Sequence, residues 1–177
     1  MNKELKTNNL FKQIIGRTVD KIYQVDYNDN RDRDYYEPWI FWITFKEYDK
    51  YIKIEGDFDG EHIKINQANI SELQKELNKN GLSKEPNLWQ VYKVEEKEKF
   101  GELLNKSILK CEFGIDKDEI TINEHKVKGQ KDVFTFFRFY YGKSFLTIFE
   151  SGCGLTVSND KNIKLDFEET FDKYLVE

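Results

Sequence analysis

The chain has 177 residues, and its 33 Asp and Glu against 28 Lys and Arg give a formal net charge of −5. This acidic balance argues against nucleic acid as a partner, because phosphates are bound by basic surfaces. No apolar run reaches the roughly 18 residues of a membrane span, and the N-terminus lacks the apolar core of a signal peptide. Two cysteines do not make a disulfide framework, so we expect a cytoplasmic protein without a membrane partner.

Two stretches of the sequence, about 90 residues apart, share a pattern of apolar residues and turns. Residues 11–19 align without a gap with 100–108, residues 43–45 and 51–54 with 137–139 and 145–148, and residues 60–65 with 152–157. A repeat of this length is typical of a duplicated half-domain. We predict one α+β domain over residues 1–177, internally duplicated, with halves of about 1–88 and 89–177. Each half is expected to be an antiparallel β meander with short flanking helices, related to the other by a pseudo-twofold axis.

In the first half, apolar residues on one face predict a helix over residues 8–15, with Thr7 as its N-cap and Gly16 at its end. A second helix near residues 71–80 is predicted by Leu73 and Leu77 on one face. Strands are expected at residues 18–25, 39–45, 51–54, 62–65 and 88–94.

In the second half, Asn105 takes the place of Gly16, and both residue types tolerate the left-handed conformation that ends a helix. Strands are expected at residues 107–113, 133–141, 144–149, 155–157 and 163–167. The strands at 39–45 and 133–141 are apolar on both faces, which predicts a central place covered on both sides. The helical spacing of Phe167, Phe171, Tyr174 and Leu175 predicts a final helix.

The loop that begins at Asp26 carries oxygen-bearing side chains at the spacing of an EF-hand calcium loop. These side chains are Asp26, Asn28, Asn30, Asp32, Asp34 and Glu37. Arg31 stands where such a loop needs Gly, and the flanking segments look like strands and not helices. A solvated acidic loop of turn-forming residues is therefore the favoured interpretation, and calcium binding stays an alternative.

A second acidic cluster consists of Asp57, Asp59 and Glu61, which alternate and would share one face of a strand. Carboxylates placed in this way can serve acid–base chemistry or bind a metal. A turn made by Gly56 and Gly60, with the acids in solvent, is the simpler interpretation.

Cys153 lies between two glycines, where an exposed thiol can act as a nucleophile. Activation needs a base or a positive neighbour, and the alignment of the halves places His62 at the matching turn of the other copy. A small apolar thiol at the start of a strand is the simpler interpretation. The sequence has no phosphate-binding loop, zinc-ligand spacing or nucleophile elbow, so we expect no cofactor and no enzymatic activity.

A resemblance adds a functional expectation. The helix end and strand at residues 14–22, followed by an apolar hairpin that ends at residues 52–60, resemble a widespread type of small bacterial protein. Members of this type have no assigned enzymatic activity, and several are regarded as immunity partners of polymorphic toxins. The resemblance therefore implies a protein partner, and the acidic balance of this chain favours a basic one.

The leading prediction is a non-enzymatic protein-binding module, an immunity-type inhibitor that blocks a basic partner sterically. Its predicted contact residues are Asp29, Asp32, Asp34, Tyr35, Tyr36, Asp57, Asp59 and Glu61. A module that binds a small ligand or a cation such as calcium is the alternative. An enzyme that uses Cys153 or the carboxylates of Asp57 and Asp59 is the least favoured interpretation, since no base, orienting group and oxyanion site can be assembled from the sequence.

Overall fold

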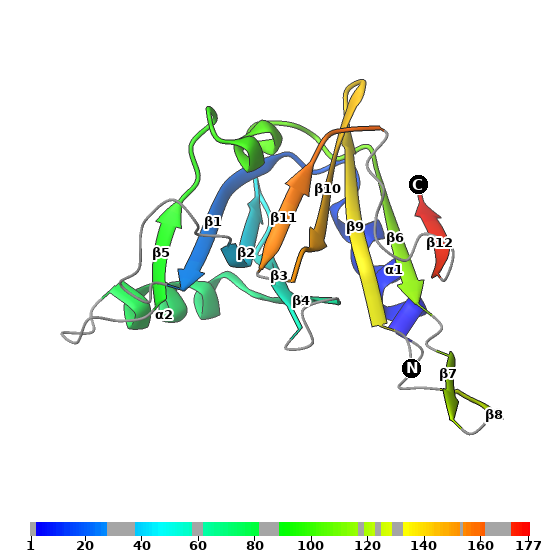
Figure 1. The fold of residues 1–177 in the computed structure, drawn as a ribbon. Coiled ribbons are helices and arrows are strands. Elements are labelled where there is room, and N and C mark those ends of the chain that lie inside the picture. The colour runs from blue at the N-terminus through cyan, green and yellow to red at the C-terminus, as the bar shows by residue number, and fades with distance from the viewer. Residues whose placement is uncertain are drawn as a thin grey trace.

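The structure is a computed structural model of the chain. It describes residues 3–27, 38–57, 62–81, 89–116, 119–122, 125–128, 133–152, 154–161 and 171–177. The elements are α1 (Lys3–Ile14), β1 (Val19–Tyr27), β2 (Pro38–Phe45), β3 (Lys50–Gly56), β4 (Ile63–Asn69), α2 (Ile70–Gly81), β5 (Trp89–Lys93), the 3-10 helix η2 (Lys99–Leu103), β6 (Lys110–Asp116), β7 (Glu119–Ile122), β8 (His125–Lys128), β9 (Val133–Tyr141), β10 (Ser144–Glu150), β11 (Leu155–Ser158) and β12 (Phe171–Val176). Figure 1 shows their arrangement.

The strands form a 10-stranded antiparallel sheet and a separate hairpin of β7 and β8. In the large sheet, β5, β1, β2, β3 and β4 are neighbours in that order, and we call them the first strand set. The second strand set is β12, β6, β9, β10 and β11, again in order of pairing. The sets meet where Ile63 of β4 pairs with Phe134 of β9. These pairings confirm the predicted α+β class with antiparallel strands.

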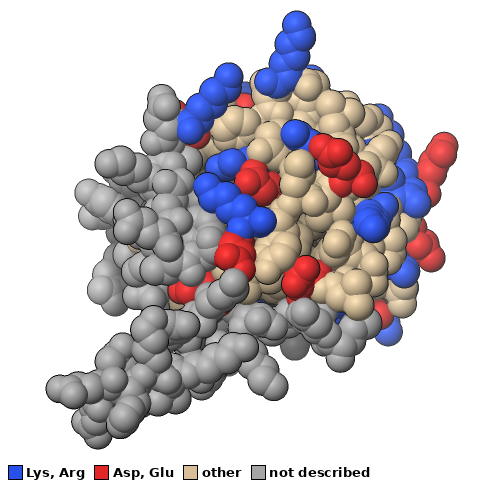
Figure 2. Space-filling model, turned by 90° about the vertical axis from the view of Figure 1, so that its right-hand side faces the viewer, with Lys and Arg blue, Asp and Glu red and all other residues tan. Residues whose placement is uncertain are grey.

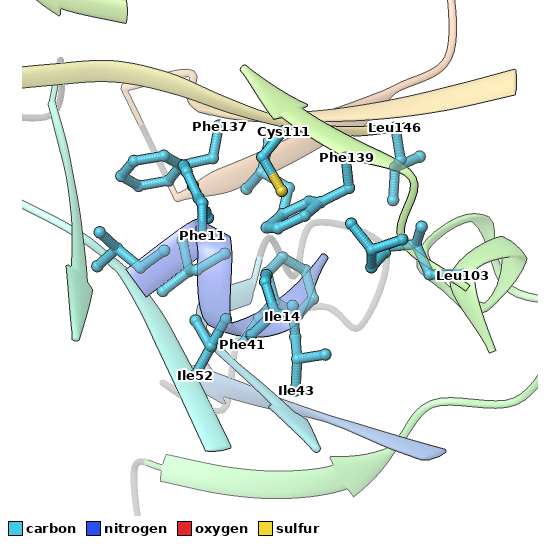
Figure 3. Packing of buried hydrophobic residues seen from close by; sticks show 14 of the residues in the cluster. Phe11, Ile14, Phe41, Ile43, Ile52, Leu103, Cys111, Phe137, Phe139 and Leu146 are labelled. Atoms are coloured by element: carbon cyan, nitrogen blue, oxygen red, sulfur yellow. The ribbon is translucent and has the colours of Figure 1, made fainter. Parts of the chain in front are cut away.

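The two strand sets share one hydrophobic core, and α1 lies between them (Figure 3). Phe11 of α1 is fully buried, and its ring centroid lies 5.8 Å from that of Phe137 and 5.9 Å from that of Phe139 in the second set. Phe41 and Ile43 of the first set belong to the same cluster. The core therefore draws on both halves of the chain.

Helix α2, at the lower left of Figure 1, covers the face of the first strand set that points away from α1 and the shared core. Its Leu73 is buried in a second cluster with Val25, Trp42 and Tyr51. Because Phe41 and Trp42 point to opposite faces of β2 and both are buried, the prediction that this strand is covered on both sides is confirmed.

The helices that precede Gly16 and Asn105 differ from the prediction at their starts or in their type. Helix α1 begins at Lys3, so Thr7 is a buried residue inside the helix and not its N-cap. Gly16 has φ +82°, and Asn105 has φ +60°, so both adopt the predicted left-handed conformation. The helix expected before Asn105 is only a short 3-10 turn, η2.

The predicted final helix is wrong, because residues 171–176 form β12, which pairs with β6. The spacing of Phe171, Tyr174 and Leu175 fits a helix, yet the same residues alternate between the two faces of a strand. Tyr174 stacks on Phe113 at 5.2 Å between centroids, whereas Leu175 is 52% exposed. Pairing with β6 also satisfies backbone groups that a helix would leave unpaired at this edge.

Candidate functional site

Most residues predicted to form a site lie outside the described residues. These are Asn28, Asp29, Asn30, Asp32, Asp34, Tyr35, Tyr36, Glu37, Asp59, Glu61 and Cys153. Asp26 and Asp57 are described. The carboxylate of Asp57 pairs with Lys64 Nζ at 2.6 Å, and the carboxylate of Asp26 accepts hydrogen bonds from Gln24 Nε2 at 2.8 and 3.1 Å.

The histidine considered as a base lies next to a carboxylate. His62 Nε2 is 3.8 Å from Asp116 Oδ2, where the start of β4 approaches the end of β6. The other cysteine, Cys111, is fully buried in the core, and burial raises the pKa of its thiol. A thiol of this kind is not an activated nucleophile, so Cys111 does not support the enzymatic interpretation.

A groove of about 600 Å³ opens between α2, the start of β1 and the turn that joins β2 to β3. Helix α2 lines it with Ile70, Leu73, Gln74 and Leu77. Ile70 is 38% exposed, although Leu73 is buried. The backbone N–H of Ile70 donates to the carbonyl of Asp49 at 2.8 Å, which joins the start of α2 to the turn. This volume is within the usual range for binding pockets, about 300–1,000 Å³.

A β-bulge shapes the wall of the groove that β1 provides. Between Val19 and Ile22, β1 has one residue more than the opposite part of β2. The buried Thr44 hydroxyl accepts a hydrogen bond from the Lys21 N–H at 3.0 Å and donates to the Lys21 carbonyl at 3.2 Å. The hydroxyl thus replaces ladder bonds that the bulge interrupts. Two consecutive polar residues between Val19 and Ile22 break the alternation of the strand, and this was the available sequence signal.

Tyr48 holds the turn that forms the third wall. Its hydroxyl donates to Gln13 Oε1 at 2.9 Å and accepts from Gln67 Nε2 at 2.8 Å. The Arg17 guanidinium lies 4.0 Å from the centre of the Tyr48 ring, in the geometry of a cation–π contact. These contacts fix the turn to α1 and β4. The groove is therefore preformed, and binding there requires little reorganisation of the wall.

Three carboxylates lie near Tyr51 on the same face of the sheet as α2. Burial is the main cause that raises the pKa of the Tyr51 hydroxyl, and the charges of Glu76, Glu72 and Glu55 raise it further. Glu55 also pairs with Lys53. Glu72 and Glu76 are exposed side chains of α2, and we call Glu55, Glu72 and Glu76 the acidic flank of α2.

The opposite side of the molecule has a different charge distribution. Figure 2 shows the side that carries β12, where blue and red side chains are interspersed among other residues. Over the coloured part of this face, neither sign gathers in a single patch. The mixture gives this face no strong preference for a charged partner.

Comparisons with known protein families, with curated proteins and with solved structures found no match. Neither α1 nor α2 is long and apolar enough to cross a membrane. Within the described ranges, no three His, Cys, Asp or Glu side chains come together in a way that could hold a metal ion. The groove and the acidic flank are therefore the features on which a function can be argued.

Proposed function

We propose that this protein is a non-enzymatic protein-binding module that inhibits a basic partner by covering its surface, as immunity proteins do. The observation that carries the proposal is the acidic flank of α2, where the exposed Glu72 and Glu76 lie near Glu55. The formal net charge of −5 has the same sign. Opposite charge on a partner would speed association and make it sensitive to salt.

Several observations support the further proposal that the chain is internally duplicated. The first and second strand sets have the same order of pairing. Across three strands, the paired residues Ile22, Ile43 and Ile52 correspond to Cys111, Phe139 and Leu146. Ile43 thus corresponds to Phe139, two positions beyond Phe137, its partner in the sequence alignment. A shift of two residues keeps the side chain on the same face of the sheet, because strand side chains alternate.

The contacts between the halves have the pattern expected for a local twofold axis. Thr18 and Ser107, which are 89 positions apart, form an isolated antiparallel bridge. On either side of it, Gly16 N donates to Ile108 O at 2.7 Å and Asn105 N donates to Val19 O at 3.0 Å. A shift by those 89 positions converts one bond into the other. Residues of like conformation therefore occupy like places in the two halves.

A pull-down from a lysate of the source organism tests the proposed function, with the tagged wild type and two variants. Glu76→Lys changes the acidic flank, and Glu177→Lys makes the same change of net charge at the C-terminus, far from α2 (Figure 1). We expect one stoichiometric basic protein on the wild type and on Glu177→Lys, released by salt and much reduced on Glu76→Lys. Absence of a stoichiometric partner, or equal retention by all three chains, would contradict the proposal.

The groove supports a second candidate function, binding of a small molecule, because its volume suits one. A small ligand would bind the wild type in the absence of any partner protein and raise its thermal midpoint by linkage. The same thermal measurement with millimolar calcium tests the calcium alternative for the loop that begins at Asp26.

A further inference from the structure

Helix α2 separates two different surfaces. Residues follow one another at about 100° around a helix axis, so Ile70 and Gln74 lie on one flank while Glu72 and Glu76 lie on the other. Buried Leu73 marks the side between them that faces the sheet. One flank of α2 is thus a wall of the groove, and the other is acidic. A partner segment that crosses α2 would meet both surfaces.

The groove offers an apolar contact of side-chain size. Ile70 and the half-buried Leu77 supply its accessible apolar surface, whereas Leu73 and Phe45 also line it but are buried. Burial of such surface contributes roughly 25 cal/mol per Å², which favours an aliphatic or aromatic side chain over a charged one. Aromatic and other large side chains inserted in preformed pockets commonly dominate the energetics of protein interfaces.

The charges at the rim of the groove do not oppose a basic segment. The wall opposite α2 carries Asp20 and Glu47 together with Lys21 and Lys46, two of each sign. Their opposite signs largely cancel, so the rim adds little net charge to that of the exposed Glu72 and Glu76 on α2. A segment that combines an apolar residue with Lys or Arg therefore complements both sides of α2.

We propose that the groove accepts an apolar side chain from the basic partner, on a segment whose Lys or Arg residues lie along Glu72 and Glu76. This inference rests on the proposed function and adds the binding determinant. Charge complementarity on one flank and apolar lining on the other select this occupant over a membrane, a second copy of the chain or an acidic protein. The preformed walls around Thr44 and Tyr48 reduce the cost of binding.

A phage-displayed library of random linear peptides, selected on the immobilised wild-type chain, provides the probe. Gln74→Trp fills the groove, and Lys75→Trp places the same side chain on the exposed outer face of α2 as the matched control. We expect selected peptides to carry Lys or Arg beside an aliphatic or aromatic residue. Gln74→Trp should weaken their binding about tenfold or more, as the loss of an anchoring side chain does, and Lys75→Trp should leave it within twofold, roughly the effect of a peripheral change.

The possible failures are distinguishable. Basic peptides whose binding is lost in Glu72→Lys or Glu76→Lys but is unchanged in Gln74→Trp would overturn the groove inference and leave the proposed function standing. Selected peptides without Lys or Arg, indifferent to Glu72→Lys, would contradict the proposed function itself. Dimerisation of the wild type that Gln74→Trp abolishes, seen by light scattering, would assign the groove to a second copy and overturn the inference.

Discussion

Asp26, near the end of β1, is a carboxyl group with an exposed fraction of 8%. Burial is the main cause that raises its pKa above the ordinary value of 3.8, and the charge of Glu98 raises it further, although the hydrogen bonds from Gln24 act in the opposite direction. A raised pKa means that the folded chain holds this proton more tightly than the unfolded chain does. The contribution of Asp26 to stability is therefore largest at low pH and falls as the pH rises from 3.8 through the raised value.

Asp26→Asn should accordingly stabilise the protein at neutral pH, because Asn keeps the shape of the side chain and carries no buried charge. The effect should be smaller at pH 3, below the ordinary value of 3.8, where the carboxyl is mostly protonated in both the folded and the unfolded chain. Thermal midpoints followed by circular dichroism at both values of pH measure the difference. Asp49→Asn, at an exposed position in the β2–β3 turn, is the control and should show little pH-dependent change. A lower midpoint for Asp26→Asn at pH 7 would contradict the argument.

At the scale of elements, β12 illustrates how pairing partners decide a local structure. Its residues can form one face of a helix or alternate along a strand, and the edge of β6 provides the partner that favours the strand. The inner face of β12 carries Tyr174 against Phe113, with an angle of 16° between the rings. The adjacent Leu175 points away and is 52% exposed.

Tyr174→Ala should lower the free energy of unfolding by about 2 kcal/mol, since it removes a stacked, partly buried ring and exposes Phe113. Leu175→Ala on the same strand should change it by less than about 0.5 kcal/mol, as expected for an exposed side chain. Urea denaturation of both variants measures the two values. Similar losses for the two would indicate that residues 171–176 are helical in solution, with both side chains on the buried face.

Helix α2 and the central strands could be predicted from the sequence because local patterns specify them. Leu73 and Leu77 repeat at helical spacing, and the strand at β2 is apolar on both faces. The groove could not be predicted, because its walls come from separate elements. The position of Tyr48, for example, depends on hydrogen bonds to Gln13 and Gln67, which lie 35 and 19 positions away. A local sequence pattern cannot predict hydrogen bonds between residues so far apart in the chain. Most of the contact residues that the sequence predicted for a protein partner lie outside the described residues.

At the scale of the whole molecule, Phe11 lies in the hydrophobic core that the two strand sets share. Besides its neighbours in β9, its ring lies 5.7 Å from that of Phe113 in β6, and the same cluster includes Ile52 of β3. Neither set can keep its inner face buried if the other set unfolds. Removing Phe11 should destabilise the core that both sets share, since substitutions of a buried Phe by Ala cost about 3–5 kcal/mol.

The chain should therefore unfold in a single cooperative step. Its three tryptophans lie in β2 and β5 of the first strand set, whereas Cys111 lies in β6 of the second. In a Cys153→Ser background, urea should change the tryptophan fluorescence and expose Cys111 to iodoacetamide at the same midpoint. Phe11→Ala should move both midpoints to lower urea by the same amount. Labelling of Cys111 at a urea concentration where the fluorescence is still native would mean that the second set opens first, and that the two halves are separate folding units joined by a weak interface.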